Sequence, residues 1–167
     1  MCNDVFRVKL PKDILKLVLS IVACQSAGLI GAVFTVSSIE NWYNLLNQPS
    51  FRPPNWLFGP AWTILYTLMG ISLYWIWTKG TKKKEVKDAL KLFAVHLVLN
   101  ATWSIVFFGM RNIPLSLLNI VVLWILIMMV MVKFYKIDQK ASFILLPYLA
   151  WVSFATILNY NIFLLNQ

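Results

Sequence analysis

The sequence predicts an all-α membrane protein, a bundle of five transmembrane helices. Of its 167 residues, 60% are apolar and only 13% are charged, and the mean hydropathy is +0.72. A soluble domain of this size could not cover so many apolar side chains with polar ones. Five apolar runs are each long enough to cross a bilayer, which needs about 20 residues. All five are predicted as helices, because a spanning segment must pair its own backbone polar groups.

The five helices are predicted to form a single domain covering residues 1–167. Their approximate ranges are 13–36, 56–78, 88–109, 114–135 and 141–165. Pro60 falls in the first turn of the second helix and Pro114 opens the fourth, where the missing N–H costs little. Gly109 closes the third helix. Pro147 lies inside the fifth and is expected to kink it near Phe143.

The basic residues lie in alternate connections. Thirteen of the 15 fall on one side, namely Arg7, Lys9, Lys12, Lys16, Lys79, Lys82, Lys83, Lys84, Lys87, Lys91, Lys133, Lys136 and Lys140. Arg52 and Arg111 fall on the other. The positive-inside rule then places the N-terminus in the cytoplasm and the C-terminus outside, in a cytoplasmic membrane. With its net charge of +9, the protein is expected to interact with a lipid bilayer and not with nucleic acid. The Lys-rich stretch 79–91 is predicted as a topology signal, with anionic-lipid binding as the alternative.

Cysteine and histidine are scarce. Cys2, Cys24 and His96 are too few for a zinc site, an iron–sulfur cluster or a Cys/His catalytic pair, so no metal site is expected. The residues up to Cys24 faintly resemble a lipoprotein cleavage signal. The apolar run continues past Cys24 to Val36, which predicts a retained spanning helix.

The longest connection, about 37–55, is expected to face outside. Its notable residues are Trp42, Tyr43, Pro49, Phe51, Arg52, Pro53 and Pro54. Paired prolines and several aromatic residues favour an ordered lid that packs on the bundle. The alternative is an interfacial aromatic belt.

Within the spans, polar residues and aromatic residues share helix faces. No carboxylate lies deep in a span, and proton-coupled transporters usually carry protons on such groups, so this function is disfavoured. Residues at helical spacing form three stripes: Trp62, Tyr66, Met69 and Leu73 on the second helix, His96, Asn100, Trp103 and Phe107 on the third, and Trp151, Ala155 and Asn159 on the fifth. The three stripes predict an apolar pocket with a few polar anchors, with plain helix packing as the alternative.

Two further features have modest interpretations. His96 is predicted to be a hydrogen-bonding residue, with its helix neighbour Asn100 as partner, in preference to an axial haem ligand. On the first helix, small residues recur at Ala23, Ala27 and Gly31, with Gly28 beside them. Such a ridge allows close helix contact, either within the bundle or between subunits.

The stretch from Trp42 to Trp77, WYNLLNQPSFRPPNWLFGPAWTILYTLMGISLYWIW, resembles the signature of the TspO/MBR family. The similarity continues at Asn100, Trp103 and FFGMR, and then at PYLAWVSFATILNY (147–160). The resemblance implies a five-helix bundle, often a homodimer, with a ligand pocket beneath the first loop. It also implies porphyrin ligands, protoporphyrin IX or haem, with no obligatory cofactor, and a link to tetrapyrrole metabolism or stress response.

The resemblance assigns roles to individual residues. Trp62 and Trp151 match two pocket tryptophans that some bacterial members use in light-dependent oxidative breakdown of protoporphyrin, which makes them the candidate catalytic residues. Asn100 and Trp103 match positions in the pocket wall. Ala155 matches a small residue that affects ligand binding in the family.

The chain departs from the family pattern at two places. His96 stands where many members have Gln. Tyr160 is followed by NIFLLNQ, without the basic residue of the animal cholesterol motif, which argues against cholesterol as a ligand.

Three functions follow from these observations. The first is a receptor or sensor whose pocket tryptophans stack on a tetrapyrrole, with Arg52 pairing with a propionate at the pocket mouth. The second is an enzyme that degrades bound protoporphyrin by photo-oxidation. The third is a transporter of tetrapyrroles or other apolar ligands, which the absence of ion-coupling residues disfavours. The predicted ligand-binding residues are Trp42, Phe51, Arg52, Trp62, Tyr66, His96, Asn100, Trp103, Phe107, Trp151, Ala155 and Asn159.

Overall fold

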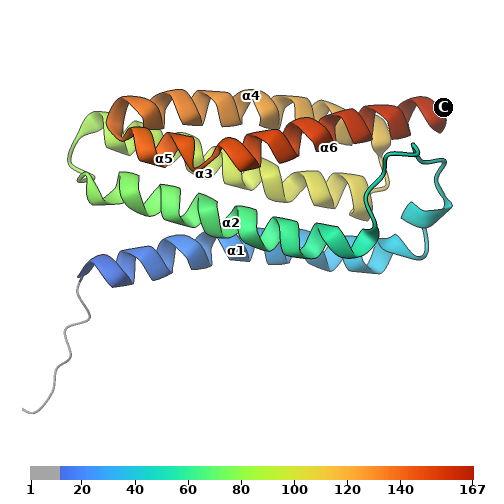
Figure 1. Ribbon diagram of the computed structural model, residues 1–167, viewed down its shortest axis with the longest axis horizontal. Helices are drawn as coiled ribbons and strands as arrows, with labels where there is room; N and C mark the ends of the chain where they lie inside the picture. Colours follow the sequence, from blue (N-terminus) through green and yellow to red (C-terminus); the bar gives the residue numbers. More distant parts are fainter. Residues whose placement is uncertain (1–11) are drawn as a thin grey trace, which may run out of the picture.

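The computed structural model describes residues 12–167 and confirms the predicted all-α architecture (Figure 1). Its helices are α1 (Lys12–Ile39), α2 (Asn55–Thr78), α3 (Lys84–Ser104), α4 (Ile113–Ile137), α5 (Gln139–Phe143) and α6 (Leu146–Leu165). A 3-10 turn (Tyr43–Leu45) lies between α1 and α2, and a π-helical turn (Ile105–Gly109) continues α3. Five helical segments of the described part are long and apolar enough to cross a membrane. Cys2, Arg7 and Lys9, on which parts of the metal and topology predictions rest, lie outside the described residues.

All five spans begin one to four residues earlier than the sequence predicted. α3 starts at Lys84, four residues before the expected start, because charged residues that favour helix extend it beyond its apolar part. α2 starts at Asn55, directly after Pro53 and Pro54, which disfavour helix before them. Pro60 therefore lies inside α2, and the prediction that it occupies the first turn is wrong.

The last span is interrupted where Pro147 was expected to disturb it. α5 ends at Phe143 and α6 begins at Leu146, with a turn between them. The break leaves the Ala141 carbonyl without its usual helical partner. The Ser72 hydroxyl, buried on α2, donates to that carbonyl over 2.6 Å, so a side chain replaces the lost backbone bond.

The end of the third span contains a feature that the sequence analysis missed. Residues Ile105–Gly109 form a π-helical turn. The span does close at Gly109, but the left-handed backbone conformation falls on Arg111, with φ of 54°. Gly109 is required for another reason, since a Cβ there would lie 2.8 Å from a ring carbon of Phe34 on α1. The glycine thus lets α1 approach the end of the span.

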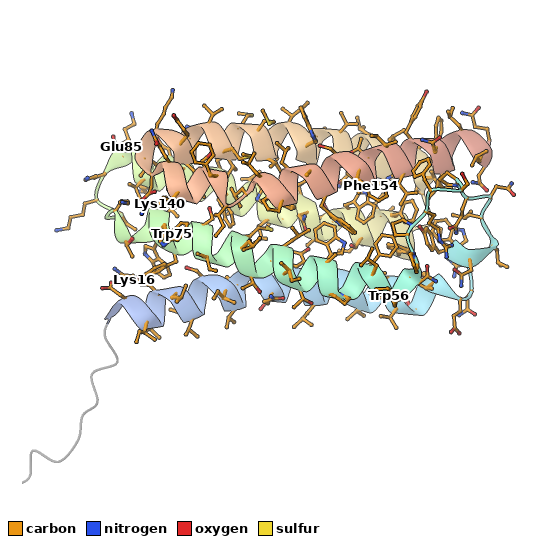
Figure 2. All side chains as sticks on the ribbon, in the orientation of Figure 1. Lys16, Trp56, Trp75, Glu85, Lys140 and Phe154 are labelled. Atoms are coloured by element: carbon orange, nitrogen blue, oxygen red, sulfur yellow. The ribbon has the colours of Figure 1, made fainter. Side chains whose placement is uncertain are left out.

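The connections divide between the two ends of the bundle. The α2–α3 and α4–α5 connections lie at the same end as the start of α1 (Figure 1). Figure 2 shows Lys16, Glu85 and Lys140 at this end and Trp56 and Phe154 at the opposite one. The two Lys-bearing connections are joined by an ion pair in which Lys79 Nζ lies 2.6 Å from Asp138 Oδ2. The lysines of these two connections therefore lie at the end of the bundle where α1 starts, as the topology prediction requires.

Candidate functional site

A cavity of about 410 Å³ lies in the half of the bundle next to the α1–α2 connection. α1, α2, the end of the third span and α6 build its wall. Residues 40–54, called the lid below, lie at its outer end and contribute Tyr43 to the lining. The volume falls within the range of small-molecule sites, about 300–1,000 Å³. Its lining is mostly apolar and aromatic, as in a site for a hydrophobic ligand.

Four tryptophans from three helices line this cavity: Trp56 and Trp62 of α2, Trp103 of α3 and Trp151 of α6. Trp103 stacks on Phe107, with ring centroids 5.4 Å apart and an interplanar angle of 18°. Trp151 meets Phe58 edge-on, with centroids 6.1 Å apart. Because neighbouring rings hold these indoles in place, the cavity presents ordered aromatic surfaces to a flat ligand.

Beneath Trp62 lies a buried hydrogen-bonded chain. Tyr66 donates to Asn100 Oδ1, and Asn100 Nδ2 donates to the Tyr148 hydroxyl over 2.8 Å. That hydroxyl lies 2.8 Å from His96 Nε2, and His96 Nδ1 lies 3.3 Å from the Phe93 carbonyl. The predicted His96–Asn100 hydrogen bond is wrong, because both side chains turn toward Tyr148 on α6 instead of toward each other.

The lid packs on the bundle, as the ordered-lid interpretation predicted. Tyr43 is 4% exposed and meets Phe107 and Phe108 edge-on, with centroids 6.0 and 5.6 Å apart. Trp42 meets Phe107 at 5.3 Å. The Arg52 guanidinium lies 5.4 Å from the centre of the Tyr43 ring. Burial raises the pKa of the Tyr43 phenol above its usual value, although the Arg52 charge opposes this.

A clasp holds the lid to the end of α6. The backbone N–H of Asn47 donates to Asn166 Oδ1 over 3.0 Å, and Asn166 Nδ2 donates to the Asn47 carbonyl over 2.8 Å. A third bond runs from Asn47 Nδ2 to the Leu165 carbonyl, at 3.2 Å. These three bonds join segments more than one hundred residues apart in sequence, so they attach the lid to the end of α6.

Polar groups on the cavity wall are few, and most are already paired. Gln25 Nε2 bridges α1 to α2 by donating to the Thr63 carbonyl and to Thr67 Oγ1, at 3.0 and 2.9 Å. Asn159 exchanges hydrogen bonds with Ser116 of α4. Within residues 12–167, Trp103 Nε1 is a buried donor without a partner. Asn55, which also lines the cavity, has a buried Oδ1 without a partner. Both residues therefore carry an unused hydrogen-bonding group.

The structure brings together some of the predicted site residues and separates others. The cavity lining includes Trp62, Tyr66, Trp103, Phe107, Trp151, Ala155 and Asn159. The remaining predicted residues are Trp42, Phe51, Arg52, His96 and Asn100, which the lining does not include. His96 and Asn100 belong to the buried chain beneath the cavity. Phe51 packs on Phe154 with centroids 6.3 Å apart, and Arg52 donates a hydrogen bond to Gln48.

Residues of α1 also line the cavity, which was not predicted from the sequence. Gln25, Gly28, Leu29, Ala32, Thr35, Val36 and Ile39 all line the cavity. The small-residue ridge was the available signal: a Cβ on Gly28 would overlap the Tyr66 ring, and one on Gly31 would lie 2.9 Å from Ser104 Oγ. The ridge at these two glycines therefore packs within the bundle.

The lining carries no ready metal site. Among residues 12–167, no three His, Cys, Asp or Glu side chains are grouped so that they could hold an ion. The wall offers indoles, phenols, amides and hydroxyls instead. These groups suit an organic ligand held by stacking and a few hydrogen bonds.

The chain is similar in sequence to known proteins. A sequence model of the TspO/MBR family matches residues 20–165. The tryptophan-rich protein TspO of Chlorobaculum tepidum is 45% identical over 155 residues, covering 93% of this chain and 98% of that protein. The protein of the same name from Archaeoglobus fulgidus is 47% identical over 154 residues, covering 92% and 99%. The translocator protein of Bos taurus is 35% identical over 141 residues, covering 84% and 83%.

Proposed function

This chain belongs to the TspO/MBR family, and we propose that it is a membrane receptor that binds a porphyrin in the cavity described above. The family and the five spans together make it an integral, multi-pass membrane protein. Among its relatives are proteins named tryptophan-rich sensory protein and translocator protein. The porphyrin, either protoporphyrin IX or haem, is the ligand that this proposal adds.

One observation carries the proposal: Trp62, Trp103 and Trp151, from three helices, line one cavity. A porphyrin is a flat and electron-rich ring, so it gains by offset or edge-on packing against indoles. Each aromatic pair contributes about 0.5–1.5 kcal/mol beyond burial. The unpaired Trp103 Nε1 and the amide of Asn159 offer polar contacts to the edge of such a ring.

Arg52 has two contacts within the lid. Its guanidinium donates to Gln48 and lies over the Tyr43 ring. A pair with a porphyrin propionate would require this side chain to leave both contacts. We therefore place the polar edge of the ligand against the cavity wall.

Ala155→Phe tests the binding proposal, because a phenyl ring at this position of the wall would occupy ligand space. Protoporphyrin IX is titrated into the purified protein in lipid nanodiscs, and its absorbance and the tryptophan fluorescence are followed. Ala150→Phe is the matched control, since Ala150 is exposed on the same helix and is not part of the lining. Weaker binding in Ala155→Phe alone supports the proposal. Equal affinity in wild type and both folded variants contradicts it.

A second function, light-dependent oxidation of the bound porphyrin, is favoured by one specific contact. The Trp62 ring lies 5.4 Å from the Tyr66 ring and 6.4 Å from the Tyr148 ring, measured between centroids. An indole that lines the cavity and contacts two phenols is a suitable electron donor to an excited ligand. Illumination of the complex, with the porphyrin absorbance followed over time, separates a receptor from an enzyme.

A further inference from the structure

α1 and α2 each carry residues that line the cavity and are also exposed. On α1, Leu29, Ala32 and Val36 line the cavity, and all three are exposed. On α2 the same holds for Trp56, Gly59 and Thr63. Both triplets follow i, i+3, i+7 spacing, so each forms one stripe along its helix. We call the line where these two stripes face each other the seam.

The smallest residues of the two stripes lie at the middle of the seam. Gln25 is bonded to Thr63 and Thr67, which sets the register of the two antiparallel helices. Toward the lid from this bond, the smallest residue of the α1 stripe is Ala32 and that of the α2 stripe is Gly59. A Cβ added to Gly59 would meet no heavy atom within 4 Å. The seam is therefore unfilled at this level.

The same two helices are in close contact beyond the cavity. A Cβ on Gly70 would lie 2.6 Å from the Ile21 Cα. Gly70 is buried, whereas Gly59 is exposed. α1 and α2 thus touch at one half of their length and leave open space at the other, where both are walls of the cavity.

Lid residues that pack on the bundle and bond to α6 cover the outer end of the cavity. Tyr43 is buried against Phe107 and Phe108, and the clasp between Asn47 and Asn166 holds the lid to α6. A ligand arriving from water would have to separate these aromatic contacts and break the clasp. A ligand dissolved in the bilayer would instead meet the exposed stripes of α1 and α2, whose smallest residues are Ala32 and Gly59.

We propose that the ligand passes into the cavity sideways from the bilayer, through the seam between Ala32 and Gly59. This inference rests on the proposed function, and it narrows the ligand to molecules that partition into lipid: flat, largely apolar rings with polar groups at one edge. The lid then serves as a fixed roof. Exchange of ligand occurs within the membrane.

Gly59→Leu tests the seam by placing a branched side chain in the gap. The association and dissociation rates of protoporphyrin IX, preloaded into the bilayer of nanodiscs, are measured by stopped-flow quenching of tryptophan fluorescence. We expect both rates to fall about tenfold, because a barrier to passage slows entry and exit alike. Ala150→Leu is the control for added bulk on a surface outside the lining. Unchanged rates in Gly59→Leu contradict the proposal.

Asn166→Ala tests the opposite route by removing two of the three clasp bonds. If the ligand passes through the seam, the association and dissociation rates of Asn166→Ala should match those of wild type. Faster association in Asn166→Ala, with no effect of Gly59→Leu, would overturn lateral passage and assign the route to the lid. A rise in Kd together with faster dissociation in Gly59→Leu would show that leucine occupies ligand space in the cavity. That result would contradict the proposal that the seam is a passage for the ligand.

A second measurement does not depend on porphyrin binding, so it separates failure of the seam from failure of the proposed function. Ala155→Cys is prepared with Cys2→Ser and Cys24→Ala, which leaves one thiol at the cavity wall. It is treated with pyrenyl maleimide dissolved in the bilayer or with a charged maleimide in water. We expect labelling by the apolar reagent, slowed by Gly59→Leu. Preferential labelling by the charged reagent, or no labelling while an Ile157→Cys lipid-facing control reacts, contradicts the proposal.

Discussion

The hydroxyl of Tyr148 on α6 lies 2.8 Å from Nε2 of His96 on α3, with both residues at most 1% exposed. The Phe93 carbonyl can only accept, so the bond at His96 Nδ1 assigns the ring proton to that nitrogen. Nε2 must then accept from Tyr148, whose oxygen accepts in turn from Asn100 Nδ2. The direction of every bond in this buried chain follows from a single backbone carbonyl.

This direction predicts the effects of substitutions at His96. His96→Leu leaves the Tyr148 hydroxyl without an acceptor and should lower the free energy of unfolding by about 1–2 kcal/mol. His96→Gln retains an acceptor oxygen and should cost less. Unfolding in mixed micelles of rising denaturing-detergent content measures both values. If Gln and Leu destabilise equally, the Tyr148 contact does not contribute to stability.

Two glycines on α2 should respond to alanine in opposite ways. At Gly59 a methyl group meets open space, so the better helix propensity of alanine should raise the free energy of unfolding by about 0.5–1 kcal/mol. At Gly70 the methyl group would lie 2.6 Å from the Ile21 backbone, and the two helices would have to separate. Gly70→Ala should therefore destabilise. Thermal unfolding of both variants checks the difference in sign.

Trp62→Phe and Trp151→Phe distinguish a receptor from an enzyme. Each keeps an aromatic face and should cost at most about 1–2 kcal/mol of porphyrin affinity. Phenylalanine is much harder to oxidise than tryptophan, so an enzyme should lose light-dependent turnover in these variants. Trp124→Phe is the control, because Trp124 bonds Ser153 and is not part of the cavity lining. Equal photobleaching in wild type, in all variants and in protein-free detergent would show that the protein does not catalyse the reaction and would support the receptor function only.

Membrane orientation can be tested at the two ends of the bundle. Lys83→Cys lies in the Lys-rich connection, and Leu45→Cys lies in the lid, where Leu45 is 78% exposed. An impermeant thiol reagent added to intact cells should label Leu45→Cys and spare Lys83→Cys, because basic connections stay in the cytoplasm. Labelling of Lys83→Cys from outside would invert the predicted topology.

The Lys79–Asp138 ion pair should contribute a small dependence of stability on pH. The hydrogen bond that Lys79 donates to Asp138 lowers the pKa of the Asp138 carboxyl below its usual value. A lowered pKa in the folded state gives stability that is present above the unfolded pKa, about 3.9, and is lost as the pH falls through the folded pKa. Tm measured from pH 6 downward should therefore fall more in wild type than in Asp138→Asn. High salt should reduce the difference, since the pair is near the surface.

The sequence by itself determined the class of the protein and most of its elements. Apolar runs long enough to span a bilayer can only satisfy their backbone as helices, and Pro114 and Pro147 mark helix positions through backbone chemistry that acts locally. The same local periodicity brought Trp62, Trp103 and Trp151 to the faces that line the cavity. These features depend on neighbours along one helix, which a sequence displays.

What lies between helices was decided by the tertiary structure alone. Helical spacing puts His96 and Asn100 on one face, but only the packing of α6 shows that Tyr148 separates their hydrogen bonds. Likewise, Gly59 and Gly70 look alike in sequence, yet one borders open space and the other touches Ile21. Register and distance between packed helices depend on all side chains at once, so no single helix encodes the seam, the clasp or the roof of the cavity.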